Sequence, residues 1–459
     1  MSVARRLYDL AAWCAQPLFL RKLRRRGRAE PGYLEHIPER FGHYTQPRFE
    51  VDSESLSPGP SPASGRGEKK QTPFPLAGER VGRGQPLIWI HAVSLGETRT
   101  AAILLDALRA RWPEMRLLLT HGTATGRAVG AVLLRTGDTQ VWQPWDTPAA
   151  TRRFFARFRP DAGVLMETEI WPNLIGEGCR AKVPIVLANA RLSEKSLRGA
   201  RRAAMLLRPA YAALSAAWAQ TEADADRLRQ AGARNVTVLG NLKFDAALDA
   251  VAMSRGQAWR AGRDKPVVML ASSREGEEAL LLDAIRAQSC QSAIQWLIVP
   301  RHPQRFDAVA DLIRAAGWSV SRRSAWPNDT PPAADGKAIW LGDSLGEMAA
   351  YYTLADAALL GGSFAPLGGQ NLIEAAACGC PVVMGPHTFN FDDAARQSQA
   401  AGAALRAPDL PAAIAQAVAL MQNPARQSRM AQAARAFAAS QRGAAQRMTQ
   451  ALAELLRQR

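Results

Sequence analysis

From residue 86 to the C-terminus, short apolar runs alternate with longer stretches rich in Ala, Leu and Arg. The short runs contain almost no polar positions, which is typical of parallel strands buried on both faces, and the longer stretches are expected to form the helices that cover them. The runs fall into two series. The first comprises residues 87–91, 116–120, 163–166, 184–187 and 236–239, and the second comprises 266–270, 296–299, 338–341, 357–360 and 381–384. Two such series predict an α/β fold with two Rossmann-like domains.

The break between the two series falls near residues 240–245, after which a helical stretch rich in Ala and Arg leads into the second series. We therefore assign an N-terminal Rossmann-like domain to residues 85–240 and a C-terminal Rossmann-like domain to residues 241–459. A chain of 459 residues is too long for one ordinary core. Two principal domains agree with the usual domain size of ~100–200 residues.

Residues 1–49 form a segment of a different kind. Residues 7–20 are apolar and include a Trp, but as a helix they would extend only ~21 Å, too short to span a membrane, and Asp9 and Pro17 interrupt them. The basic run 21–28 follows at once. An apolar, Trp-bearing helix beside such a run is typical of an anchor that lies on an anionic membrane surface. A helix packed on the first domain with a solvated basic face would show the same pattern.

Residues 50–84 change character again. Gly, Pro and Ser occupy 16 of these 35 positions, and five basic residues balance five acidic ones. A segment of this composition cannot bury enough apolar surface to offset the entropy lost on ordering. We therefore predict a disordered, low-complexity insertion without a catalytic role.

The whole chain carries 58 Lys and Arg against 41 Asp and Glu, a formal net charge of +17, of which residues 1–49 contribute +6. A nucleic-acid-binding surface would interleave its cations with exposed aromatic side chains. Here the aromatic residues fall mostly inside the predicted strands, so we expect no nucleic-acid partner. The five cysteines have neither metal-site spacing nor a disulfide pattern, and we predict no metal and no other cofactor.

The tetrapeptide Ser-Leu-Gly-Glu occurs twice, as residues 94–97 and 344–347, each time just after a predicted strand. Ligands of parallel sheets bind at the carboxyl ends of the strands, so Glu97 could act there as a general base. The sequence Ser-x-x-Glu is also a capping box, in which Ser and Glu satisfy the first N–H groups of a helix. The pattern leaves both interpretations open for each copy.

Residues 361–374 form a glycine-rich loop that leaves a predicted strand and opens into a helix. Free N–H groups at the positive end of a helix suit a phosphate, and the carboxylate of Glu374 could accept hydrogen bonds from the two hydroxyls of a ribose. The spacing matches neither the dinucleotide fingerprint nor the P-loop, and the glycines could serve only to make turns. Arg301, at the end of the predicted strand 296–299, could hold a phosphate or form a surface salt bridge.

Several segments together, in their order and approximate spacing, resemble those of the 3-deoxy-D-manno-octulosonic acid (Kdo) transferases of lipopolysaccharide synthesis. They are residues 91–97, 167–173, 189–196, 240–245, 300–303, 361–374 and 385–391. The resemblance extends from about residue 4 to the C-terminus, except for residues 50–84. It implies a GT-B glycosyltransferase with two Rossmann-like domains facing a central cleft. Such an enzyme moves Kdo from CMP-Kdo to the lipid A precursor lipid IVA, with inversion and without a required metal.

The resemblance also implies roles for individual residues. Glu97 would be the general base, and Glu167 and Lys243 would stabilise the transition state. The residues implied to bind CMP are Pro300, Arg301, Leu345, Gly346, Glu347, Asn371, Leu372, Ile373 and Glu374. The pattern leaves open which of Glu167 and Glu169 faces the substrates, and either could instead be the partner of Arg191. The chain also has Gln370 where the family commonly has His.

The implied substrates offer an explanation for the positive charge outside residues 1–49. Lipid IVA and CMP-Kdo are both anionic, which suits the surplus of cations in the two domains. We expect residues 1–49 to hold the protein on anionic lipids at the cytoplasmic face of the inner membrane.

Overall fold

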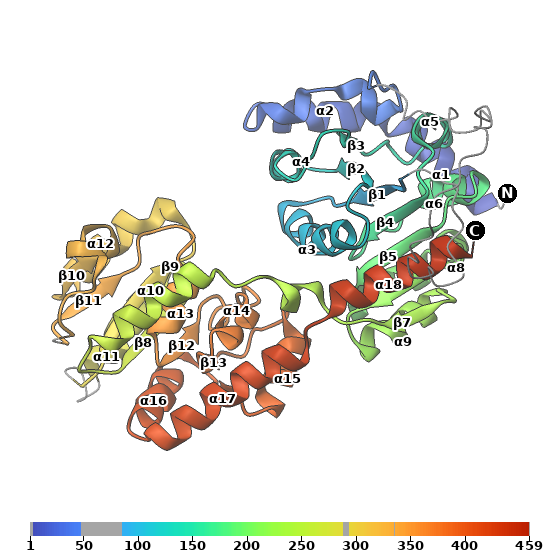
Figure 1. Ribbon diagram of the computed structural model, residues 1–459. Helices are drawn as coiled ribbons and strands as arrows, with labels where there is room; N and C mark the ends of the chain where they lie inside the picture. Colours follow the sequence, from blue (N-terminus) through green and yellow to red (C-terminus); the bar gives the residue numbers. More distant parts are fainter. Residues whose placement is uncertain (1–2, 47–84, 288–292, 335, 459) are drawn as a thin grey trace, which may run out of the picture. The chain divides into compact units, whose positions relative to one another are not determined.

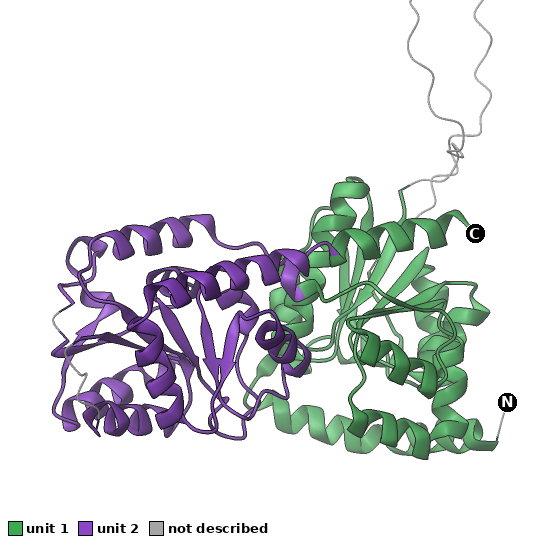
Figure 2. Cartoon of the chain, turned by 90° about the horizontal axis from the view of Figure 1, so that it is seen from below, with its two compact units in different colours: residues 1–242, 444–459 green, residues 243–443 purple. Residues whose placement is uncertain are grey.

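The computed structural model describes residues 3–46, 85–287, 293–334 and 336–458. The predicted insertion at 50–84 lies outside the described residues. The chain divides into two compact units (Figure 2): unit 1 comprises residues 1–242 and 444–459, and unit 2 comprises residues 243–443.

Unit 1 is built on a parallel seven-stranded sheet with the strand order β3-β2-β1-β4-β5-β6-β7 (Figure 1). The strands are β1 (Leu87–His91), β2 (Arg116–His121), β3 (Thr139–Trp142), β4 (Ala162–Met166), β5 (Ile185–Ala190), β6 (Ala216–Ala219) and β7 (Val236–Val238). Along β1, Leu87 and Trp89 pack into one hydrophobic cluster, and Ile88 and Ile90 pack into another. Because side chains alternate across a strand, the sheet is buried on both faces, as its apolar runs predict.

Helices cover both faces of this sheet. They are α3 (Leu95–Arg111), α4 (Ala124–Ala131), α5 (Pro148–Phe158), α6 (Pro172–Arg180), α7 (Glu194–Arg202), α8 (Ala204–Ala212) and α9 (Glu222–Ala231). Most begin at a Ser or Thr whose hydroxyl accepts a hydrogen bond from the first turn: Ser94, Thr123, Thr147, Ser193 and Thr221. These caps satisfy N–H groups that have no partner inside the helix.

The N-terminal segment contains two short helices, α1 (Val3–Cys14) and α2 (Gln16–Gly27), followed by the 3-10 turns η1 (Pro31–Leu34) and η2 (Ile37–Phe41). Pro17 lies in the first turn of α2, where its missing N–H is tolerated, so the apolar stretch 7–20 is divided between two helices. None of the described helices has both the length and the apolar run needed to cross a bilayer.

Unit 2 repeats the architecture with the strand order β10-β11-β9-β8-β12-β13-β14, again parallel. The strands are β8 (Val267–Ser273), β9 (Gln295–Pro300), β10 (Ser319–Arg322), β11 (Ala338–Leu341), β12 (Ala357–Leu360), β13 (Val382–Met384) and β14 (Ala404–Arg406). The helices are α10 (Ala250–Ala261), α11 (Glu277–Ala287), α12 (Phe306–Ala315), α13 (Met348–Leu354), α14 (Leu372–Ala377), α15 (Asp392–Ala400), α16 (Leu410–Met421) and α17 (Pro424–Ser440). The short 3-10 turns are η4 (Leu242–Asp245), η5 (Pro303–Arg305), η6 (Arg323–Ala325) and η7 (Pro327–Asp329). The two Rossmann-like domains predicted from the sequence are therefore present.

The C-terminal helix α18 (Ala444–Arg457) belongs to unit 1, not to the second domain that the sequence assigns to residues 241–459. Its apolar positions explain this difference. Met448 and Leu452 are buried in the same cluster as Leu104 and Leu108 of α3. The helix thus completes the cover of the unit 1 sheet, and the chain returns to unit 1 after unit 2.

Candidate active site

Glu97 lies in the first turn of α3, directly after β1. One carboxylate oxygen accepts a hydrogen bond from the Val93 N–H at 2.9 Å, and the other accepts one from the Ser94 hydroxyl at 3.0 Å. The Ser94 hydroxyl in turn accepts a hydrogen bond from the Glu97 N–H, so the first tetrapeptide is a capping arrangement. Burial raises the pKa of Glu97, the bonds from Val93 and Ser94 oppose this shift, and the charge of Glu167 adds to it. The side chain remains partly exposed, so capping leaves it available to a substrate.

Glu167 follows β4 and is nearly buried, with 5 % of its surface exposed. Its φ of 56° is left-handed, which is unusual for a residue with a side chain. The carboxylate forms a salt bridge with Nε of Arg191 at 2.9 Å, and the Arg191 N–H donates to the Glu167 carbonyl. Arg191 is therefore the direct partner of Glu167, which answers a question that the sequence leaves open.

Glu169 occupies a separate position nearby. Its Oε2 accepts a hydrogen bond from Trp171 Nε1 at 2.7 Å and lies 4.0 Å from Nε2 of the fully buried His91. Burial raises the pKa of Glu169 to about 7, and the charge of Glu97 contributes to that rise. Burial lowers the pKa of His91 to about 3, so this histidine is neutral at physiological pH. Three glutamates thus gather at the carboxyl edge of β1 and β4.

The same segment ties the edge of the sheet to α1. The Asn173 side chain accepts a hydrogen bond from Arg5 and donates one to Asp9, both at 2.9 Å. Asp146, which accepts hydrogen bonds from the first N–H groups of α6, also accepts one from the Tyr8 hydroxyl at 2.7 Å. Residues 171–173 therefore position Glu169 and fasten α1.

The polar side of α1 faces the domain, and its apolar side faces outward. Val3, Leu7, Leu10 and Trp13 are 71 %, 62 %, 59 % and 66 % exposed, and Leu18 on α2 is also exposed. This spacing places Val3, Leu7 and Leu10 on the helix face opposite Arg5 and Tyr8. The sequence prediction of an amphipathic N-terminal helix agrees with this arrangement.

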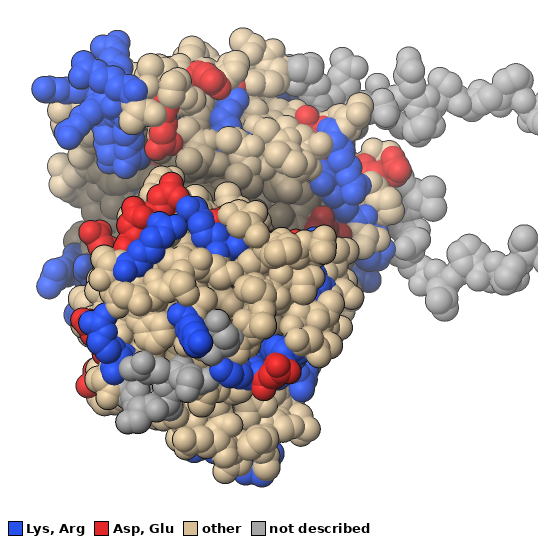
Figure 3. Space-filling model, turned by 90° about the vertical axis from the view of Figure 1, so that its left-hand side faces the viewer, with Lys and Arg blue, Asp and Glu red and all other residues tan. Residues whose placement is uncertain are grey.

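Basic side chains dominate the next helix. A dense group of Lys and Arg side chains lies over the C-terminal end of α2 (Figure 3). They surround a groove of about 560 Å³ lined by Leu18, Arg21, Lys22, Arg24, Arg25 and Arg28. Such a concentration of cations suits phosphate groups.

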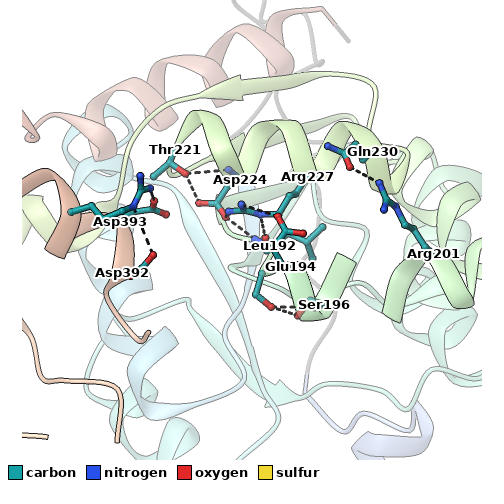
Figure 4. Close-up of polar contacts among 12 residues, drawn as sticks. Leu192, Glu194, Ser196, Arg201, Thr221, Asp224, Arg227, Gln230, Asp392 and Asp393 are labelled. Atoms are coloured by element: carbon teal, nitrogen blue, oxygen red, sulfur yellow. Dashed lines mark hydrogen bonds and ion pairs between the residues drawn. The ribbon is translucent and has the colours of Figure 1, made fainter. Parts of the chain in front are cut away.

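Hydrogen bonds hold the segment 189–196, which contains Arg191, in place. The Asn189 side chain accepts a hydrogen bond from the Leu242 N–H at 3.0 Å. Ser193 caps α7, and the Leu192 N–H donates to Asp224, which is also bonded by Thr221 and Arg227 (Figure 4). These bonds fix the loop after β5, which carries Arg191.

In unit 2 the second tetrapeptide folds differently from the first. Gly346 has a φ of 80°, so α13 begins only after Glu347, and Leu345 is 73 % exposed. The Glu347 carboxylate accepts a hydrogen bond from Ser344 at 2.5 Å and pairs with Arg255 and Arg323 at 2.5 and 2.9 Å. The capping interpretation therefore fails for this copy, because the left-handed glycine turns the chain before the helix starts.

The sequence predicts free N–H groups in the glycine-rich loop, but the structure shows a partner for one of them. The Gly362 N–H donates to both oxygens of Glu277, at 2.8 and 2.9 Å, and the Arg274 N–H donates to the same carboxylate at 2.9 Å. The buried carboxylate of Glu277 thus takes up the Gly362 N–H, which is not free to bind a phosphate. Nothing in the spacing of residues 361–374 indicates Glu277, which lies in the first turn of α11 after β8.

The remaining predicted donor residues lie beyond that loop. Asn371 caps α14 through a hydrogen bond from the Ile373 N–H, Leu372 and Ile373 are buried, and Glu374 is partly exposed. Burial raises the pKa of Glu374, and the charge of Arg301 opposes this shift. Arg301 is exposed after the buried Pro300 at the end of β9, so its side chain can reach a ligand.

Lys243 lies in η4, with its ammonium group 5.1 Å from the centre of the Phe391 ring. Phe391 belongs to the segment 385–391 that the resemblance includes. Across the described ranges, His, Cys, Asp and Glu side chains form no group of three that could hold a metal ion. The absence of a cofactor stays a prediction.

The sequence of this chain is similar to those of known proteins. A family model described as 3-Deoxy-D-manno-octulosonic-acid transferase (kdotransferase) matches residues 35–246. A 3-deoxy-D-manno-octulosonic acid transferase from Bordetella pertussis is 50 % identical over 378 residues, which cover 80 % of this chain and 87 % of that protein. A protein of the same name from Haemophilus influenzae is 32 % identical over 369 residues, covering 79 % and 85 %.

The fold has relatives among solved structures as well. The UDP-GlcNAc 2-epimerase from Neisseria meningitidis, solved with UDP-GlcNAc, covers 80 % of this chain and 99 % of its own, with a TM-score of 0.54 and 14 % identity. This likeness concerns the fold alone.

Proposed function

The chain belongs to the 3-deoxy-D-manno-octulosonic acid (Kdo) transferase family, and from that premise we propose that it moves Kdo from CMP-Kdo to lipid IVA with inversion, with Glu97 as the general base. The observation that carries the proposal is the position of Glu97. Its carboxylate is fixed by Val93 and Ser94 at the carboxyl edge of the unit 1 sheet and remains partly exposed. A general base must be held in this way to meet the proton that it removes.

The proposed reaction is a single displacement. Glu97 takes the proton of the acceptor hydroxyl as that oxygen forms a bond to the anomeric carbon of Kdo. The bond from this carbon to the phosphate oxygen breaks, and CMP leaves with the electron pair. The transition state has oxocarbenium character, and fixed charges nearby can stabilise it without rearranging.

Fixed charges of both signs support the proposal. Glu167, locked to Arg191, presents a negative charge beside Glu97, and Lys243 offers a positive charge for the departing phosphate. In unit 2, Arg301 and Glu374 have the chemistry to hold the phosphate and the ribose of CMP. Pro300, Leu345, Gly346, Glu347, Asn371, Leu372 and Ile373 complete the proposed donor site of a GT-B enzyme, in which donor and acceptor bind to different domains.

The test is the isosteric substitution Glu97→Gln. It retains an oxygen that can accept the bonds from Val93 or Ser94 but removes the basic group, so transfer should fall by about 10²–10⁴-fold. Binding of CMP-Kdo, measured by calorimetry, should be unchanged because the proposed donor residues lie in unit 2.

Products of incubation with lipid IVA and CMP-Kdo would be weighed by mass spectrometry, which also counts the Kdo units added. Glu114→Gln, at an exposed position, is the matched control. Turnover of Glu97→Gln within tenfold of the unaltered protein would remove Glu97 as the base.

The proposed location is the cytoplasmic face of the inner membrane. The outward apolar face of α1 would enter the interface, and the cations of α2 would meet anionic headgroups. Flotation with vesicles should show binding that requires anionic lipid and weakens with salt.

Two variants separate the parts of this surface. Replacing Leu7, Leu10 and Trp13 by Ser should abolish flotation. Replacing Arg24, Arg25 and Arg28 by Gln should weaken flotation with anionic vesicles and reduce its sensitivity to salt. A matched control replaces the exposed Arg426 and Arg429 by Gln, which removes charge elsewhere. Equal loss of flotation in the control would contradict a surface made by α1 and α2.

A further inference from the structure

A groove of about 680 Å³ opens on unit 1 between α1, η2 and the first turn of α5. Its apolar lining consists of Trp13, Ile37, Pro38, Phe41, Pro148 and Ala149. Three of the polar side chains that line it, those of Asp9, Thr147 and Arg153, already have partners. Asp9 accepts a hydrogen bond from Asn173, the Thr147 hydroxyl caps α5, and Arg153 donates to the Phe41 carbonyl at 3.1 Å. A ligand in this groove would therefore contact mainly apolar surface.

The groove lies at the same edge of the sheet as Glu97. Residues 147–149 follow the loop that leaves the carboxyl end of β3, and β3 is separated from β1 only by β2. The buried Asp146 in this loop holds both Tyr8 of α1 and the start of α6. The groove is therefore fixed to the same framework as the glutamates.

The surroundings of the groove indicate the chemistry of its occupant. Trp13 both lines the groove and ends the exposed apolar row on α1, so the apolar surface is continuous. Gln16, which also lines the groove, is the first residue of α2, whose cations follow within two turns. An apolar groove followed by a cluster of cations is complementary to an amphiphile with an apolar chain and a phosphorylated head.

We propose that the groove binds one acyl chain of the lipid acceptor and thereby positions its sugar head for Glu97. This inference rests on the function proposed above. It adds a site on unit 1 that selects acceptors by acylation. The occupant is a chain of the acceptor itself, not of a bulk membrane lipid.

The test uses Ala149→Trp, an exposed position in the first turn of α5 where a large side chain fills the groove. Two acceptors are compared: lipid IVA, and the same phosphorylated disaccharide with its acyl chains removed. Loss of contact with a few buried methylene groups should raise the KM for lipid IVA about tenfold. The KM for the deacylated acceptor should not change. Ile37→Ser, which makes one wall polar without filling the groove, should act in the same direction.

The control is Ala439→Trp, at an exposed alanine of α17 in unit 2, and thermal unfolding verifies that each variant is folded. Equal effects on both acceptors, or none on either, would overturn the proposal. A loss of vesicle flotation without any change in preference between the acceptors would show that the groove takes a membrane lipid. Failure of the unaltered protein to transfer Kdo to either acceptor would instead remove the proposed function.

Discussion

Glu169 lies in surroundings that favour its protonated form. Burial and the charge of Glu97 raise its pKa to about 7 from the ordinary value of 4.5. The folded protein keeps this proton up to about pH 7, whereas the unfolded chain releases it near pH 4.5. The contribution of Glu169 to stability is therefore full below pH 4.5, is lost as the pH rises through 7, and amounts to roughly 3 kcal/mol.

The substitution Glu169→Gln should remove this dependence. Gln keeps an oxygen for the Trp171 N–H but cannot ionise, so the variant should gain stability relative to the unaltered protein between pH 5 and pH 8. Thermal unfolding midpoints measured at both pH values test the difference. The control variant Glu114→Gln, at an exposed position, should show the same dependence of stability on pH as the unaltered protein. A parallel decline of Glu169→Gln and the unaltered protein over this range would contradict a raised pKa.

The sequence could place these glutamates at the edge of the sheet but could not distribute their roles. Glu167 and Glu169 are two residues apart, which would put both on one face of a regular strand. The left-handed backbone at Glu167 breaks that alternation, and one carboxylate pairs with Arg191 while the other meets Trp171. The left-handed turn that begins at Glu167 separates the two carboxylates, and the residue type at position 167 does not predict it.

At the scale of elements, Glu277 joins the first turn of α11 to the glycine-rich loop after β12. Its carboxylate accepts hydrogen bonds from the N–H groups of Gly362 and Arg274. Glu277→Ala would leave buried N–H groups without partners, and each such group costs about 1–3 kcal/mol. We expect a lower unfolding temperature for unit 2 and weaker binding of CMP, measured by calorimetry. Glu275→Ala, at an exposed neighbouring position, should change neither. If the Glu277→Ala variant is destabilised but binds CMP with unchanged affinity, the glycine-rich loop is not part of the donor site.

The strands predicted from the sequence are the ones with strongly apolar runs. β3, β10 and β14 were missed because they lie at or next to a sheet edge and mix polar residues into short runs, as in Ser319–Arg322. β6 was missed although it lies inside the sheet, because three of the four residues in its Ala-Ala-Trp-Ala run are Ala, which is depleted in strands. Its position follows from pairing with β5 and β7, which no local pattern shows.

At the scale of the whole molecule, the surplus charge of +17 divides by segment. The N-terminal cations gather on α2 around one groove, beside an apolar helix face. Many arginines of the two units are instead used internally, as in the pairs of Arg191 with Glu167 and of Arg305 with Glu278. Net charge alone therefore does not identify a binding partner. Only cations that lie together at the surface, and are not paired within the fold, are available to bind one.

The chain path also makes unit 1 depend on its last helix. Met448 of α18 is fully buried against α3, although unit 2 separates the two helices in sequence. Met448→Asp would place a charge in this core and should destabilise unit 1 by at least about 3 kcal/mol. Unit 2 has its own core, so limited proteolysis should digest unit 1 and leave a protected fragment near residues 243–443. Gln450→Asp, on the exposed side of the same helix, should leave both units resistant. Simultaneous digestion of both units in Met448→Asp would mean that they unfold together, in spite of their separate sheets.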